Sequence, residues 1–89
     1  MTDEQKQYIR DNITDIAEKA FPDNIGNEWI IHHIIEHPKG IDVEVEARPD
    51  DVGYSRFRFI IEFKTPTAPN ITECYSLEES GEWDLLFTD

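Results

Sequence analysis

Two neighbouring stretches of the chain alternate between hydrophobic and polar residues, with Ile60 as the exception in the second stretch. In residues 41–48 the hydrophobic positions are Ile41, Val43, Val45 and Ala47, and in residues 56–64 they are Phe57, Phe59, Ile61 and Phe63. A period of two residues is typical of a β-strand that buries one face. The link at 49–55 contains Pro49 and Gly53, which favour turns. We therefore predict that the two stretches pair antiparallel, with one face on a core and the other in water.

The first twenty residues carry a helical pattern instead. Their hydrophobic residues recur at the spacing of one helix face, at Ile9, Ile13, Ile16, Ala17 and Ala20. Thr2 and Gln5 have the spacing of a capping box, and Pro22 disfavours helical geometry at Phe21. These signals predict one amphipathic helix of about 18 residues, roughly 27 Å long.

Residues 28–37 fit two interpretations. Asn27 and Pro38 would cap and stop a helix, whereas four isoleucines and Trp29 favour a strand. Residues 38–40 then resemble a hairpin connection, so we predict a strand. Such a strand would be apolar on both sides, with Trp29, Ile31, His33 and Ile35 on one face and Ile30, His32 and Ile34 on the other.

The C-terminal part predicts a second hairpin, with strands at 71–78 and 82–88 around a turn at 79–81. If this hairpin is symmetric about Ser80, the facing pairs are Leu77 and Trp83, Tyr75 and Leu85, Ser76 and Asp84, and Glu78 and Glu82. The whole chain, residues 1–89, is then expected to form a single α+β domain, an N-terminal helix packed on an antiparallel meander of about five strands. Cystatin-like folds offer an analogy of architecture, which carries no function with it.

Charge is the extreme feature of the composition. Twenty acidic residues against eight basic ones give a formal net charge of −12. Binding to nucleic acid requires Lys and Arg to neutralise phosphates, so we expect no direct contact with DNA or RNA. The same charge disfavours an anionic membrane surface. A basic protein partner is favoured, although solubility alone also explains an acidic surface.

The acidic residues are unevenly distributed. Glu44 and Glu46 are expected to form cross-strand ion pairs with Arg56 and Arg58. The last twenty residues, in contrast, contain no Lys or Arg. The candidate partner-binding patch therefore comprises Glu73, Glu78, Glu79, Glu82 and Asp84, together with Asp50 and Asp51.

A histidine cluster supplies the other candidate chemistry, at His32, His33, Glu36 and His37. Residues 33–37 match the H-x-x-E-H string of zinc peptidases, which requires a helix to bring its ligands together. On a strand His33 and His37 share a face while Glu36 points away, so we expect neither a metal nor any other cofactor. Cys74 has no basic neighbour to activate it, and we expect it to be a small strand residue.

These patterns favour a non-enzymatic binding or inhibitory module that docks a basic protein such as a nuclease, a toxin or a nucleic-acid-binding protein. Immunity proteins and DNA mimics are small acidic domains of this kind. One alternative is a structural subunit that forms a homodimer through residues 29–35, and another is a small metal-dependent enzyme built on the histidine cluster. A cytoplasmic location is expected, because the chain has one cysteine, a polar N-terminus and no apolar run long enough to span a bilayer.

Overall fold

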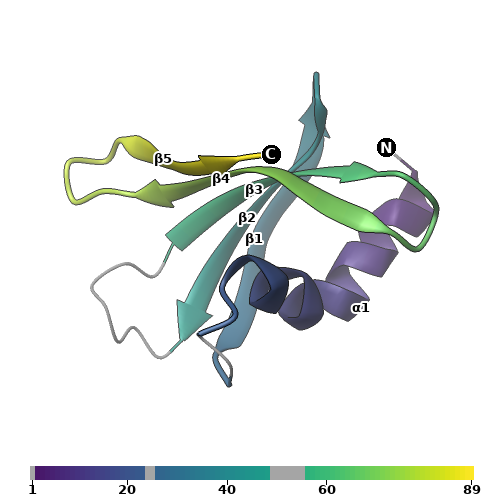
Figure 1. Ribbon diagram of the computed structural model, residues 1–89, viewed down its shortest axis with the longest axis horizontal. Coiled ribbons are helices and arrows are strands. Elements are labelled where there is room, and N and C mark those ends of the chain that lie inside the picture. Colours follow the sequence, from purple (N-terminus) through teal and green to yellow (C-terminus); the bar gives the residue numbers. More distant parts are fainter. Residues whose placement is uncertain (1, 24–25, 49–55) are drawn as a thin grey trace.

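An N-terminal helix packs against one face of a five-stranded antiparallel sheet (Figure 1). The computed structural model describes residues 2–23, 26–48 and 56–89. Its elements are α1 (Asp3–Ala20), β1 (Glu28–His37), β2 (Gly40–Arg48), β3 (Arg56–Phe63), β4 (Pro69–Leu77) and β5 (Trp83–Thr88). The strands follow one another in the order β1-β2-β3-β4-β5, which leaves β1 and β5 at the two edges. The predicted α+β meander is confirmed.

Helix α1 begins where the sequence predicts. The Oγ1 atom of Thr2 accepts a hydrogen bond from the Gln5 backbone at 3.1 Å, and Gln5 Oε1 accepts one from the Thr2 backbone at 3.1 Å. This reciprocal capping box satisfies two backbone donors that the helix itself leaves unpaired. The helix is kinked at Asn12, where φ is −125° and the side chain donates to the Tyr8 carbonyl at 2.9 Å. No helix in the described ranges 2–23, 26–48 and 56–89 is long and apolar enough to cross a membrane.

The core lies between α1 and the sheet. The alternating hydrophobic residues of β2 and β3 face the helix, and Val43, Val45, Phe59 and Ile61 are fully buried there. Ile9, Ile13, Ile16 and Ala17 cover them from α1. Phe21, just past the helix, stacks on Trp29 of β1 with 6.1 Å between the ring centroids. The faces predicted for these two strands are therefore confirmed.

Residues 28–37 form a strand, as predicted, but the predicted faces are wrong beyond Ile31. A β-bulge leaves His32 without a partner in the register, so that Ile31 lies opposite Val45 and His33 opposite Glu44. A bulge adds one residue and changes the face of every side chain beyond it. Ile34 consequently packs against the core, while His33 and Ile35 turn to the other side of the sheet.

The face of the sheet that points away from α1 is called the open face here. It can be followed across the strands in one row of neighbours, Glu44 of β2, Arg58 of β3, Tyr75 of β4 and Leu85 of β5. The C-terminal hairpin has the predicted register, with Tyr75 opposite Leu85, Ser76 opposite Asp84 and Leu77 opposite Trp83. Further irregularities at Thr72 and Leu86 interrupt the alternation of β4 and β5.

Candidate functional site

The centre of the open face carries a network of paired charges. Asp42 is 7% exposed, and its Oδ1 atom lies 3.2 Å from Arg58 Nε and 3.4 Å from His33 Nε2. Arg58 Nε is close enough to Asp42 for an ion pair but not aligned for a hydrogen bond. Glu44 lies between Arg56 at 3.5 Å and Arg58 at 3.7 Å. The predicted cross-strand pairing of Glu44 is therefore confirmed.

Glu46 belongs to the same network but has different partners from those predicted. One carboxylate oxygen lies 2.7 Å from Arg48 Nε, and the other lies 2.8 Å from His32 Nε2. The hydrogen bond from Arg48, followed by that from His32, lowers the pKa of Glu46 below its ordinary value. Arg56, opposite Glu46 in the register, donates to His32 at 3.1 Å instead. The bulge at His32 makes this possible, because it brings both His32 and His33 to the open face.

Glu73, a residue of the predicted acidic patch, also has partners. The Tyr75 hydroxyl donates a hydrogen bond to its carboxylate, and Lys39 Nζ lies 3.1 Å away. Tyr75 first and Lys39 second lower the pKa of Glu73, and the same hydrogen bond raises the pKa of Tyr75. Glu73 thus differs from the acids of the hairpin turn. Lys39 lies in the turn between β1 and β2, and the sequence alone does not show that this turn lies near Glu73 of β4.

The remaining described patch residues, Glu78, Glu79, Glu82 and Asp84, surround the β4–β5 turn and are called the hairpin acids here. None of them forms an ion pair with any residue of the described ranges. The Ser76 hydroxyl is 3.5 Å from Glu78, at the limit of a hydrogen bond. Two backbone hydrogen bonds hold the turn, from Glu78 N to Glu82 O at 2.8 Å and from Gly81 N to Glu78 O at 2.9 Å. Asp50 and Asp51 lie outside the described residues.

Two leucines on β5 adjoin these acids and were not singled out from the sequence. Leu85 is 50% exposed and Leu86 is 45% exposed; in the described ranges, Ile35 is the other large hydrophobic residue with such exposure. Leu85 lies on the open face next to Trp83, over whose ring the Arg58 guanidinium sits at 4.5 Å. The only sequence signal was the pair of adjacent leucines in a strand that should alternate. The surface formed by the hairpin acids, Trp83, Leu85 and Leu86 is called the hairpin surface below.

The histidine cluster follows the strand geometry. His33 and His37 lie on the open face, and Glu36 lies opposite Ile41, a core residue of the other face. In the part of the chain that the structure describes, no three His, Cys, Asp or Glu side chains are placed to hold a metal ion. Cys74 is fully buried, and burial raises the pKa of its thiol to about 12. A thiol with so high a pKa is a poor nucleophile at neutral pH.

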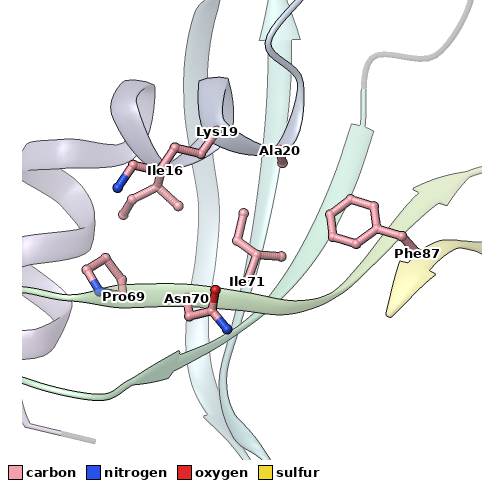
Figure 2. Close-up of a pocket in the computed structure, with 7 residues that line it drawn as sticks. All are labelled: Ile16, Lys19, Ala20, Pro69, Asn70, Ile71 and Phe87. Carbon is pink, nitrogen blue, oxygen red and sulfur yellow. The ribbon is translucent and has the colours of Figure 1, made fainter. Parts of the chain in front are cut away.

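A small cavity lies between the second half of α1 and the strands β4 and β5 (Figure 2). Its volume is about 130 Å³, and its lining comprises Ile16, Lys19, Ala20, Pro69, Asn70, Ile71 and Phe87. Pockets for drug-sized ligands usually measure roughly 300–1,000 Å³. At about 130 Å³ this cavity lies below that range.

Comparison of the chain with protein-family models, with curated proteins and with solved structures finds no match.

Proposed function

We propose that this protein is a non-enzymatic binding module that docks a basic protein through the hairpin surface. The observation that carries the proposal is the coexistence, on one edge hairpin, of exposed leucines and carboxylates that form no ion pair with any described residue. Elsewhere on the sheet Asp42, Glu44, Glu46 and Glu73 have basic partners. Within residues 2–23, 26–48 and 56–89, the hairpin acids are carboxylates without an ion pair that lie next to the exposed leucines of β5.

The two features contribute to binding in different ways. Clustered carboxylates attract a basic partner and speed its association, an effect that salt screens. Leu85 and Leu86 provide apolar area that is removed from water on contact, which stabilises the complex after encounter. A nuclease, a toxin or a nucleic-acid-binding protein offers the basic surface that this combination suits. Covering that surface would inhibit the partner, as immunity proteins and DNA mimics do.

The test replaces the hairpin acids by their amides, as Glu78→Gln, Glu79→Gln, Glu82→Gln and Asp84→Asn. Immobilised protein captures partners from a cell extract at low salt, and mass spectrometry identifies them. Association rates of the identified partner are then measured for both proteins over a range of salt concentrations. We expect slower association of the variant at low salt, with the difference shrinking as salt rises.

The matched control removes four negative charges elsewhere, at the exposed residues Glu4, Asp15, Asp23 and Glu62. This variant has the same net charge as the hairpin variant, so only the position of the charge differs. Equal association rates for the two variants would mean that net charge alone matters. A hairpin variant that binds at the wild-type rate in low salt would overturn the proposal.

A second candidate function is self-association through β1. Ile35 is 50% exposed at this edge of the sheet, on the open face. Two copies could bury it by pairing their β1 edges. Sedimentation at high micromolar concentration tests this: a dimer that Ile35→Lys dissociates supports it, and a wild-type monomer excludes it.

A further inference from the structure

We propose that the outer edge of β5 binds its partner by adding an extended segment to the sheet, and that this segment alternates basic and apolar side chains. The inference rests on the proposed function and specifies its mode of recognition. Strand addition supplies backbone hydrogen bonds for affinity and alternating side chains for specificity.

The edge is available within the described part of the chain. β5 is the last strand of the sheet and pairs with β4 along one side. The backbone groups on its other side have no strand partner, and such groups favour pairing with another extended chain. In Figure 1 the β4–β5 hairpin projects beyond the end of β3, away from α1.

The two faces of this edge have opposite chemistry. Leu85 and Trp83 belong to the open face, since they lie opposite Tyr75 and Leu77 of β4. Asp84 lies opposite Ser76, which in turn lies opposite the core residue Phe57. Asp84 therefore points to the helix side of the sheet. β5 thus presents apolar side chains on one face and a carboxylate on the other.

An added strand must match both faces residue by residue. A residue opposite Asp84 lies on the helix side, where a basic side chain can pair with the carboxylate. Its two neighbours lie on the open face beside Trp83 and Leu85, where apolar side chains are favoured. Glu82, two residues before Asp84, extends the acidic side to a second basic position. The irregularity at Leu86 ends the regular edge, so the segment spans only about four to six residues.

A second copy of the chain is a poor occupant. If two copies paired through their β5 edges, their carboxylates would lie opposite each other across the two strands. Like charges in cross-strand positions are destabilising. The β1 edge is also less suited to a basic segment. Its middle contains the bulge at His32, and His32 and His33 already contact Glu46, Glu44 and Asp42.

The experiment compares synthetic peptides of identical composition, measured by fluorescence anisotropy. The alternating peptide Lys-Val-Lys-Val-Lys-Val is expected to bind about tenfold more tightly than the block peptide Lys-Lys-Lys-Val-Val-Val. Two further peptides carry N-methyl groups, one on the lysines and the other on the valines. A strand paired along one edge uses the N–H of every second residue, so only one of these two peptides should lose binding. Bound peptide should also slow hydrogen exchange of β5 amides.

Variants of the protein test the two faces separately. Asp84→Asn and Leu85→Ser should each weaken the alternating peptide, whereas Ile35→Ser, at the opposite edge, should not. Equal binding of alternating and block peptides, or of both methylated peptides, would overturn strand addition. So would the absence of binding by every peptide. The salt-dependent association through the hairpin acids is measured in a separate experiment. A negative peptide result would therefore overturn strand addition without deciding the proposed function.

Discussion

The centre of the open face and the β4–β5 hairpin both carry several carboxylates, but the surroundings of these carboxylates differ. In the centre, Asp42, Glu44 and Glu46 lie among arginines and histidines from three strands, within 2.7–3.7 Å of their partners. In the hairpin, Glu82 and Asp84 are exposed and form no ion pair with a described residue. Charge in the centre is neutralised by the fold, and charge in the hairpin is left for solvent or a partner.

The two regions also differ in packing, since the centre covers buried residues and the hairpin carries exposed ones. Beneath the central charges, Val43, Val45 and Phe59 are fully buried against α1. On the hairpin, Leu85 and Leu86 remain about half exposed. Burial and pairing in the centre imply a structural role. The hairpin acids have no ion pair with a described residue, and they are the residues on which the proposed function depends. The following four predictions test this distinction.

The largest effect is expected at Phe59. Phe59→Ala removes a fully buried ring from the centre of the core and should lower the free energy of unfolding by about 3–5 kcal/mol. Leu85→Ala removes a half-exposed side chain and should cost less than about 1 kcal/mol. Urea denaturation of both variants measures the difference. Similar losses would mean that the hairpin is as structural as the core.

Arg58 should matter next, because it contacts Asp42, Glu44 and the Trp83 ring. Arg58→Met leaves two poorly exposed carboxylates with fewer partners, which should cost about 1–3 kcal/mol of stability. Lys64→Met is the control, since Lys64 is exposed. Equal, negligible changes in the two urea midpoints would show that the central pairs contribute nothing.

Acid should act on the partnered carboxylates. The folded-state pKa values of Glu46 and Glu73 lie below the ordinary value of 4.5, so these groups stabilise the fold fully above that pH. Their contribution is lost as pH falls through the lowered folded-state values. The double variant Glu46→Gln and Glu73→Gln should therefore show a weaker loss of stability between neutral pH and pH 3 than wild type. Unfolding curves measured across this pH range test the prediction. An identical loss of stability in the two proteins would show that Glu46 and Glu73 do not contribute to the pH dependence.

The smallest effect on stability is expected at the hairpin acids. Replacing all four by amides should leave the melting temperature unchanged or slightly raised, because like charges around one turn repel. Calorimetry of this variant beside Arg58→Met gives the direct comparison. A decrease as large as that of Arg58→Met would mean that the hairpin acids support the fold.

Much of this architecture can be predicted from local patterns. The capping box at Thr2 and Gln5 marks the start of α1, and the period of two residues marks β2 and β3. The hairpin register around Ser80 is also predictable, because Ser80 and Gly81 mark the turn and three of the predicted pairs beside it form as expected. In each case the signal lies within a few residues of the structure that it predicts.

The faces of β1 could not be predicted in the same way. Isoleucines occupy both alternating sets of residues 28–37, so a shift at His32 buries an isoleucine in either register and leaves no trace in the hydrophobic pattern. The bulge becomes visible only when Val43, Val45 and Glu44 of β2 lie beside it. The pairing of Lys39 with Glu73 and the exposure of Leu85 and Leu86 likewise depend on strands distant in the chain. Local periodicity determines which elements form, whereas contacts across the sheet determine which side chains they leave exposed.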